Sequence, residues 1–303
     1  MAVPDLSSVY TFAEGCVHSA DVLRVLVQVD ELNAKKVPNT MLLRYEPATR
    51  DKEGFDLDWT AIKIVSRADP SLLVLAVGPE GQVCVATAAG MSTEQIGTSN
   101  EGPPADGLIR DMRIIGSGVF AAGMGRQVYQ RVSAGRWKPI HGRILQPQSL
   151  TEVRGFNALH GLDESEFLAV GWYGEIYRRK GKTWREEDSG TNVILNDVHV
   201  APDGTAYAAG QMGVLLRNAG KGWRIIDHGG TKEQIYGLQW FADRLFLATE
   251  DELFSLEKDK LKRIKFQRES TFQSLDANDG VLLSVGAKDI WWTRDARKWN
   301  RVD

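Results

Sequence analysis

The chain has 303 residues with 37 basic and 40 acidic side chains, which gives a formal net charge of -3 at pH 7. A near-neutral charge excludes the strongly basic surface with which proteins attract nucleic acid or anionic membranes. The hydrophobic fraction of 43% is enough for a core, and no stretch reaches the ~20 apolar residues that a membrane-spanning helix needs.

Residues 1–60 are the least regular part of the chain. The opening sequence MAVPDLSSVYTFAEG has neither the basic region nor the apolar run of a signal peptide, so we expect a cytoplasmic protein. Apolar runs at 9–12, 22–29, 41–45 and 55–59 flank a polar segment, DELNAKKVPN (30–39). A helix also fits 21–30, but its four valines favour a strand. These runs form either a sheet of their own or a segment that completes the last sheet.

From residue 62 onward, a cycle of four short apolar runs repeats. Runs of three to seven residues separated by Gly, Asn, Asp and Pro are typical of strands joined by tight turns. The runs lie at 62–65, 72–77, 83–86 and 94–96; 109–115, 119–122, 128–132 and 137–140; 195–200, 205–209, 214–216 and 223–226; 235–240, 245–248, 253–256 and 261–266; and 272–275, 281–285, 290–293 and 299–302, with one further cycle in 156–187.

A repeat of about 40 residues made of four strands is typical of a propeller blade. We therefore expect an all-β fold, a β-propeller of four-stranded antiparallel blades in a single domain (1–303). Seven blades are favoured, with 1–60 as a degenerate first blade; the alternative is six blades with 1–60 closing the ring. The repeat's anchor position follows the second strand, at Gly78, Gly123, Gly171, Gly210, Glu250 and Gly286. Segments 97–107 and 141–155 are expected to be long loops between blades.

The string GWYGEIYRRKGKTW followed by SGTNVILNDV resembles the repeat of the photosystem II stability/assembly factor-like propellers, within the BNR and YVTN-type, WD-repeat-like proteins. The matching residues are Gly171, Gly174, Ile176, Arg178, Gly181, Thr183, Trp184, Ser189, Gly190 and Thr191. The resemblance extends over about 107–303 and implies a propeller fold that binds something, with no particular activity.

Four tryptophans recur at the start of the fourth strand: Trp137, Trp184, Trp223 and Trp299. Their periodic placement predicts that they pack between blades. Trp172 and Tyr173 differ, since they lie in a turn between the second and third strands, where other blades carry less aromatic sequence. We therefore treat this turn as a candidate contact site.

Motifs that carry chemistry are missing from the sequence. It contains no nucleophile elbow, zincin motif or phosphate-binding glycine loop. Acidic runs at 186–188 and 250–252 are interpreted as solvated surface charge. His160 and His199 occupy equivalent places in neighbouring innermost strands, where hydrogen bonding is commoner than a metal site. Cys16 and Cys84 are expected to be buried free thiols. We predict no metal, no cofactor and no catalytic residue.

In a propeller, one rim carries both the turns that join the second and third strands and the loops that connect the blades. Mixed aromatic, Met and charged side chains on such a rim are typical of protein-binding surfaces; the alternative is scattered exposed side chains of no consequence. The predicted partner-binding residues are Met124, Arg126, His141, Arg143, Trp172, Tyr173, Gln211, Met212, Asp227, His228, Glu250, Asp251 and Glu252.

Two functional hypotheses follow. The first is a monomeric, non-enzymatic protein that captures a protein partner on this rim, as an assembly factor or as a bacterial immunity protein that neutralises a toxin. The second is a carbohydrate-binding or sialidase-like propeller, which needs arginines and carboxylates facing the channel. The inner strands offer Arg110, Asp111, Arg113, Asp197 and Asp276. A tight hub pocket of converging ionised side chains would contradict the first hypothesis.

Overall fold

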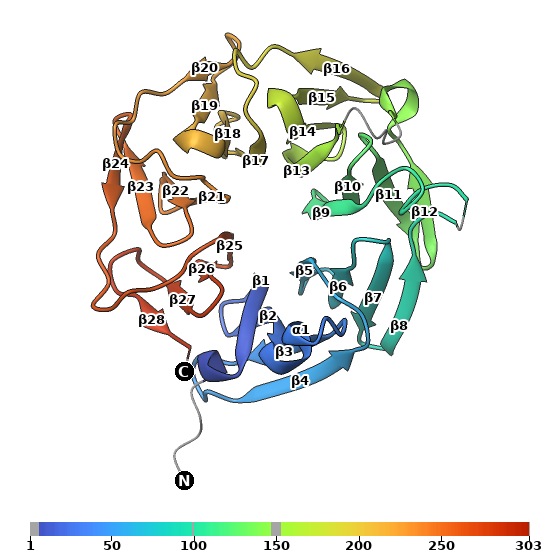
Figure 1. The fold of residues 1–303 in the computed structure, drawn as a ribbon, viewed down its shortest axis with the longest axis vertical. Helices are drawn as coiled ribbons and strands as arrows, with labels where there is room; N and C mark the ends of the chain where they lie inside the picture. Colours follow the sequence, from blue (N-terminus) through green and yellow to red (C-terminus); the bar gives the residue numbers. More distant parts are fainter. Residues whose placement is uncertain (1–5, 99, 147–152, 303) are drawn as a thin grey trace.

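Seven four-stranded antiparallel sheets are arranged as a closed wheel (Figure 1). The computed structural model describes residues 6–98, 100–146 and 153–302. Each sheet uses four consecutive strands, the first next to the hub and the last on the outer wall. The predicted fold class, an all-β propeller with seven blades, is confirmed, and the six-blade alternative is wrong.

The blades are numbered in chain order. Blade 1 contains β1 (Tyr10–Ser19), β2 (Val22–Val29), β3 (Thr40–Tyr45) and β4 (Lys52–Leu57). Blade 2 contains β5 (Lys63–Arg67), β6 (Leu73–Val77), β7 (Gln82–Thr87) and β8 (Gly90–Gln95). Blade 3 contains β9 (Ile109–Ile115), β10 (Gly118–Gly123), β11 (Val128–Ser133) and β12 (Arg136–Pro139).

Blades 4 to 7 follow the same plan. Blade 4 contains β13 (Phe156–Asp163), β14 (Glu166–Gly171), β15 (Ile176–Lys180) and β16 (Thr183–Glu187). Blade 5 contains β17 (Leu195–Val200), β18 (Ala206–Gly210), β19 (Leu215–Asn218) and β20 (Arg224–Ile225). Blade 6 contains β21 (Gly237–Phe241), β22 (Arg244–Ala248), β23 (Leu253–Glu257) and β24 (Lys260–Arg263). Blade 7 contains β25 (Ser274–Asn278), β26 (Val281–Val285), β27 (Ile290–Thr293) and β28 (Asn300–Arg301).

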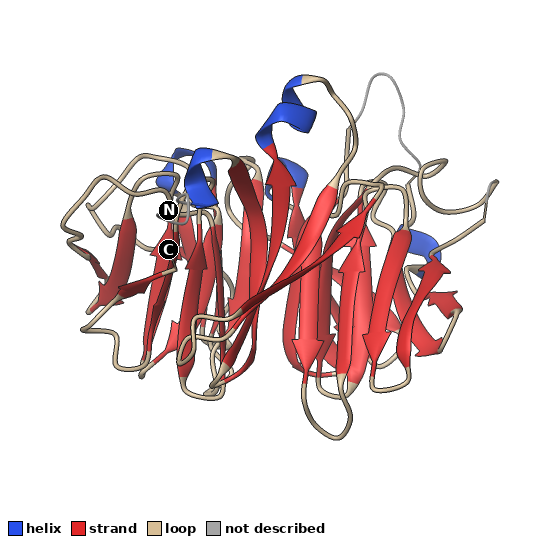
Figure 2. Ribbon diagram, turned by 90° about the horizontal axis from the view of Figure 1, so that it is seen from below, coloured by secondary structure: helices blue, strands red, loops and turns tan. Residues whose placement is uncertain are grey.

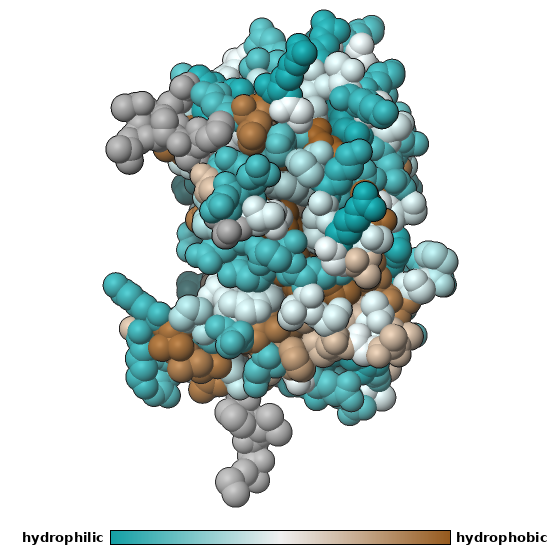
Figure 3. Space-filling model, turned by 90° about the vertical axis from the view of Figure 1, so that its right-hand side faces the viewer, coloured by the Kyte–Doolittle hydropathy of each residue, from teal (hydrophilic) through white to brown (hydrophobic). Residues whose placement is uncertain are grey.

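Burial along the strands explains why these runs are apolar. The second strands β6, β18 and β26 are buried at every residue, because neighbouring blades cover both of their faces. Fourth strands such as β16 and β24 are largely exposed and carry charged residues. The outer wall at the right of Figure 1 is accordingly covered mainly by hydrophilic side chains, with apolar ones showing between them (Figure 3).

The glycine that recurs at the end of the second strand is required for steric reasons. A Cβ on Gly171 would lie 1.9 Å from the carbonyl oxygen of Gly155, and one on Gly210 would lie 2.0 Å from that of Ile194. In blades 4 and 5 the end of the second strand therefore touches the backbone of the incoming interblade loop. In blade 6 the equivalent residue is Thr249. Its N–H donates to the Glu252 carbonyl, and the Gly171 N–H donates to the Glu175 carbonyl in the same way. The sequence-based anchor at Glu250 was one residue off.

The four recurrent tryptophans pack between blades, as predicted. The indole N–H of Trp184 donates to the Ile140 carbonyl oxygen at 2.9 Å, and that of Trp223 donates to Glu187 at 2.8 Å. Trp137 likewise donates to Glu94 of blade 2 at 3.0 Å. The Trp299 ring packs edge-on against Phe266, 5.6 Å away. Each ring thus fastens the outer wall of its blade to the preceding blade.

The ring closes where blade 1 meets blade 7, without exchange of strands. The Phe12 N–H donates to the Ala287 carbonyl at 3.0 Å, and the Val17 N–H donates to Asp276 at 2.7 Å. The Lys288 ammonium lies 2.6 Å from Asp30. Apolar side chains of both blades form one core cluster behind these bonds. Residues 10–57 thus form a complete sheet of their own.

One face of the wheel carries the turns between second and third strands and the loops that connect blades; we call it the loop face. The helical segments lie along this side (Figure 2): α1 (Asp30–Ala34), η1 (Leu6–Ser8), η2 (Gly142–Ile144), η3 (Trp172–Gly174) and η4 (Gln211–Gly213). Residues 22–29 form β2 rather than a helix, and α1 opens the polar segment that follows. Among the described residues, none of these helices has the length and apolar character to cross a membrane.

Candidate functional site

The tips of two adjacent turns hold large side chains out from the loop face. Tyr173 at the centre of η3 and Met212 at the centre of η4 have φ angles of 55° and 57°. This left-handed conformation is disfavoured for bulky residues and costs about 1–2 kcal/mol each. Their side chains are nevertheless 52% and 74% exposed. Glycine would fit the backbone at both positions without strain, and burial within the chain does not explain two side chains that are this exposed.

Both turns are held rigidly from below. A Cβ on Gly174 would lie 2.1 Å from the Thr191 carbonyl oxygen, and one on Gly213 would lie 2.5 Å from that of Thr231. The Gly213 carbonyl is also 2.7 Å from His228 Nε2. Each turn is therefore seated on the interblade loop that follows its blade. Tyr173 and Met212 are presented in fixed positions.

Beside Tyr173 lies a buried carboxylate that the sequence analysis did not single out. Glu175 is 4% exposed and accepts hydrogen bonds from Arg126 Nε at 3.0 Å and from Arg154 Nη1 at 2.7 Å. The Glu175 hydrogen bonds raise the pKa of Arg126. The two guanidinium groups also stack on Tyr177 and Tyr173, at 5.1 and 5.4 Å from the ring centroids. The cluster positions Tyr173 from the side.

Three of the predicted rim residues are buried. Met124 and His141 are 9% exposed and His228 is 7% exposed. His141 Nδ1 accepts the Val128 N–H at 3.2 Å, and burial lowers the pKa of this histidine. Their side chains therefore support the loops and offer no open surface, which corrects their assignment to the exposed rim.

The remaining predicted residues differ in exposure. Arg143, Asp227, Glu250 and Asp251 are exposed. Glu252 is half-buried and pairs with Arg263 at 3.0 Å. Trp172, Gln211 and Arg126 are half-buried, and the Trp172 indole nitrogen is buried without a hydrogen-bond partner among the described residues. The loop 141–155 lies partly outside the described residues.

The short helix α1 also lies on this face, and it was not predicted from the sequence. The segment of α1 rises above the neighbouring turns (Figure 2), and Val37, just after it, is 44% exposed. Its polar sequence carried no repeat signal that could have identified it. The face thus has a projection at blade 1 and displayed apolar tips at blades 4 and 5.

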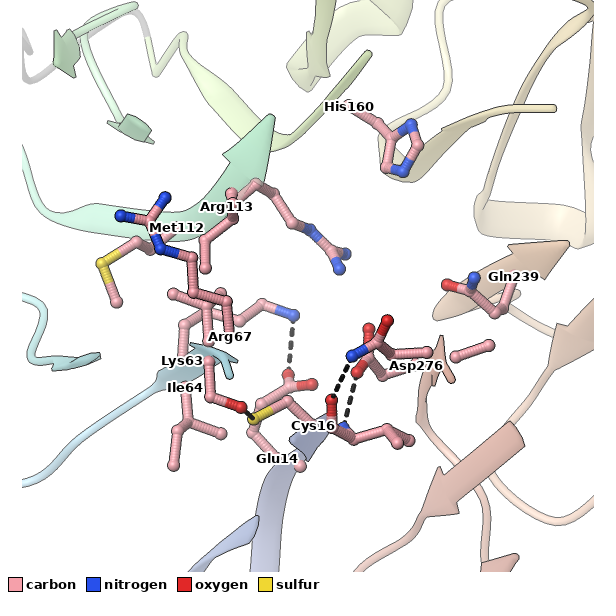
Figure 4. A pocket seen from close by; sticks show the side chains of 17 residues that line it. Glu14, Cys16, Lys63, Ile64, Arg67, Met112, Arg113, His160, Gln239 and Asp276 are labelled. Carbon is pink, nitrogen blue, oxygen red and sulfur yellow. Dashed lines mark hydrogen bonds and ion pairs between the residues drawn. The ribbon is translucent and has the colours of Figure 1, made fainter. Parts of the chain in front are cut away.

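Ionised side chains converge in the hub, an arrangement that the sequence analysis named as contrary to a non-enzymatic protein. Lys63 is 2.6 Å from Glu14 and 3.9 Å from Asp111. Arg113 is 3.4 Å from both Asp111 and Asp197. Figure 4 shows Lys63 and Glu14, from the neighbouring inner strands β5 and β1, pointing toward each other. This layer borders a chamber of about 270 Å³ on one side and one of about 210 Å³, at the loop face, on the other.

Backbone hydrogen bonds give these hub carboxylates a structural role. Asp111 accepts the N–H of Leu159 at 2.8 Å and Asp197 that of Leu238 at 2.8 Å. Asp276 accepts the N–H of Val17 at 2.7 Å. Each carboxylate therefore fastens its inner strand to the next blade. Burial raises the pKa of Asp197 to about 6, although Arg113 and Lys63 act to lower it. The remaining inner-strand candidate, Arg110, is exposed.

His160 and His199 come together in the hub, with ring centroids 4.1 Å apart. His160 Nδ1 accepts the Val200 N–H at 3.0 Å and His199 Nε2 accepts the Trp240 N–H at 3.3 Å. Burial, with Arg113 nearby, lowers the pKa of His160 to about 3. Both rings link neighbouring blades in the neutral form. In the part of the chain that the structure describes, no three His, Cys, Asp or Glu side chains are grouped as metal ligands.

Comparison with known proteins gives one relative that spans the chain. No family model matches the sequence. The immune protein Tsi7 of Pseudomonas aeruginosa strain PAO1 is 32% identical over 303 residues, which covers 98% of this chain and 99% of Tsi7.

Solved structures with similar folds are also propellers. The WD40 β-propeller domain of Doa1 has a TM-score of 0.67 at 11% identity and covers 92% of this chain and 90% of its own. The structure of YCF48 bound to D1 peptide has a TM-score of 0.67 at 12% identity and covers 96% and 94%. At such identities these likenesses show the propeller fold alone, and the repeat type suggested by the sequence stays a prediction.

Proposed function

The chain belongs to the family of the immune protein Tsi7, and on that premise we propose that it is an immunity protein that neutralises a protein toxin by binding it. The binding is stoichiometric and non-enzymatic, and the loop face makes the contact. The protein acts as a cytoplasmic monomer in a bacterium. An assembly-factor role, the other form of the binding hypothesis, receives no comparable support from the relative.

The observation that carries this proposal is the display of Tyr173 and Met212 at strained turn tips. A side chain of this size contributes about 1.5–3 kcal/mol when it passes from water into an apolar contact. That gain is available only if a second molecule covers the tips, since they are 52% and 74% exposed in the chain alone. A rigid turn also loses little entropy on binding.

The test is protection of growth in cells that also express a candidate protein toxin, chosen from the genes that neighbour this one. The double variant Tyr173→Ala/Met212→Ala is expected to fold normally and to lose protection, with toxin affinity at least about thirtyfold weaker. Leu162→Ala is the matched control, because Leu162 is 51% exposed on the opposite face. Full protection by the double variant would refute the assignment of the face. Failure of the unaltered chain to protect against the toxin would refute the function.

The proposal that the protein is not an enzyme is tested at the hub network. If Arg113 and its carboxylate partners served chemistry on a glycoside, Arg113→Gln would abolish activity in a sialidase assay and binding on a glycan array. We expect neither activity nor glycan binding in the unaltered chain, because Asp111, Asp197 and Asp276 are already bound to backbone N–H groups. Turnover of a glycoside by the unaltered chain would refute the proposal that it is not an enzyme.

A further inference from the structure

The hub chamber of about 270 Å³ lies on the face opposite the loop face. Its wall includes Arg67 and Asn278, the last residues of the inner strands β5 and β25. Charged and polar side chains from several blades surround it (Figure 4). Pockets for drug-sized ligands have volumes of about 300–1,000 Å³, so this chamber suits a smaller molecule.

Arg113, in the wall of this chamber, makes few hydrogen bonds for a guanidinium inside a protein. Its side chain is 17% exposed, and it contacts Asp111 through Nε and Asp197 through Nη2, both at 3.4 Å. An N–H···O hydrogen bond is usually about 2.7–3.2 Å long, and a guanidinium has five N–H donors. Among the described residues, Nη1 of Arg113 has no hydrogen-bond partner. Arg113 can therefore donate stronger hydrogen bonds to an acceptor in the chamber.

His160 supplies a second donor beside Arg113. Its Nδ1 accepts the Val200 N–H at 3.0 Å, and burial, with the Arg113 charge nearby, lowers its pKa to about 3. The neutral ring therefore carries its proton on Nε2. This nitrogen has no hydrogen-bond partner in the part of the chain that the structure describes, and the ring borders the chamber (Figure 4). Donors from β9 and β13 are thus available to one acceptor group.

Acceptors border the same chamber from two other blades. Asp276 uses Oδ2 to accept the Val17 N–H at 2.7 Å, and Gln239, which is 9% exposed, donates from Nε2 to the Trp240 carbonyl at 3.2 Å. Within the described ranges, Oδ1 of Asp276 and Oε1 of Gln239 have no hydrogen-bond partner. These two oxygens can accept hydrogen bonds from a donor group in the chamber.

Arg113 and Asp276 carry opposite charges at this chamber but do not touch. Burial raises the pKa of Asp276 and the Arg113 charge acts against this rise, so the two groups are within electrostatic reach. No ion pair joins them in the described structure. An anion bound to Arg113 would be repelled by Asp276, and a cation bound to Asp276 would be repelled by Arg113. A molecule that carries both charges is complementary to both side chains.

We infer that the hub chamber binds a small zwitterion, a free α-amino acid, with its carboxylate on Arg113 and His160 and its ammonium group on Asp276 and Gln239. The bound ligand links the inner strands of blades 3, 4, 6 and 7 across the channel. Because it binds the closed wheel and not the unfolded chain, it raises the melting temperature. The inference is independent of the proposed function, since the toxin is expected on the loop face.

The direct test titrates the protein with L-alanine and with two derivatives that each lack one charge. Amide chemical shifts of residues 63–67, 112–114 and 276–278 are expected to move with L-alanine, whereas those of 171–175 and 210–214 on the loop face stay constant. N-acetyl-L-alanine lacks the ammonium group and L-alaninamide lacks the carboxylate, so both should bind at least about tenfold more weakly. No shifts at millimolar L-alanine, or equal binding of either derivative, would overturn the inference.

Matched variants locate the site. Asp276→Asn keeps a side-chain carbonyl for the Val17 N–H but removes the charge, and it should weaken L-alanine binding at least about tenfold. Asp279→Asn is the control, because Asp279 also joins blades 7 and 1, accepting the Ala20 N–H at 2.8 Å, but lies outside the chamber wall. Asparagine tolerates its φ of 48°.

A second variant keeps the test valid if Asp276→Asn does not fold. Gln239→Met removes the acceptor oxygen at similar volume and should weaken L-alanine binding about threefold. If the folded variant of Asp276 or Gln239 binds L-alanine as tightly as Asp279→Asn does, the inference is refuted.

Discussion

The strained backbone at Met212 can be tested by comparing two substitutions. Glycine and alanine both remove the Met212 side chain, but they differ in how well they tolerate φ = 57°. Alanine keeps the left-handed penalty of about 1–2 kcal/mol, whereas glycine removes it and adds about 0.5–1 kcal/mol of unfolded-state entropy. Met212→Gly should therefore be more stable than Met212→Ala by about 0.5–1 kcal/mol. Both variants should bind the toxin equally weakly, since both lose the exposed side chain.

Met91 provides the matched control. It is 45% exposed and lies in β8, an extended strand with ordinary backbone angles. Here glycine carries the entropic penalty alone, so Met91→Gly should be less stable than Met91→Ala by about 0.5–1 kcal/mol. The order of the glycine and alanine variants thus reverses between the two sites.

Urea unfolding of the four variants measures these differences through their midpoints at constant slope. A free-energy change of 1 kcal/mol corresponds to about 2 °C in melting temperature for a chain of this length, so thermal scans give a second estimate. If Met212→Gly is no more stable than Met212→Ala, the turn stores no strain, and the reason for regarding its tip as functional is lost.

Two further predictions concern the fold. Gly210→Ala places a Cβ 2.0 Å from the Ile194 carbonyl and should lower the free energy of unfolding by about 3 kcal/mol in urea titrations; a loss below 1 kcal/mol would show that the interblade loop moves freely. His160 has a pKa lowered to about 3 in the folded state, so its contribution to stability is complete above its ordinary pKa of about 6.5 and is lost as the pH falls toward 3. His160→Asn should remove about 2–3 kcal/mol of the stability loss between pH 6.5 and 4, and equal pH slopes for the two proteins would contradict a neutral, half-buried ring.

The regular part of this fold could be predicted from sequence because each blade repeats the same physical requirements. Gly171 and Gly210 are needed where two backbones touch, and Trp184 and Trp223 fill the same gap between blades. Thr249 takes the place of this glycine in blade 6, and the predicted anchor at Glu250 fell one residue too late.

The site was only partly predictable, because side-chain direction in loops depends on tertiary contacts. His141 and His228 were expected on the surface, but both turn inward to accept backbone N–H groups. Glu14 and Lys63 were missed in the hub because the first two blades carry little of the repeat signature. Tyr173 and Met212 were identified as turn residues, but only the backbone angles show that their placement is strained.

The proposed function requires contact between a toxin and the loop face, and hydrogen exchange of the complex measures that contact most directly. Exchange of backbone amides in 171–175, 210–214 and 249–252 is predicted to slow when the toxin binds. The turns of the opposite face, 162–166, 201–205 and 242–244, should exchange as in the free protein. Slowed exchange confined to those opposite turns would contradict the account.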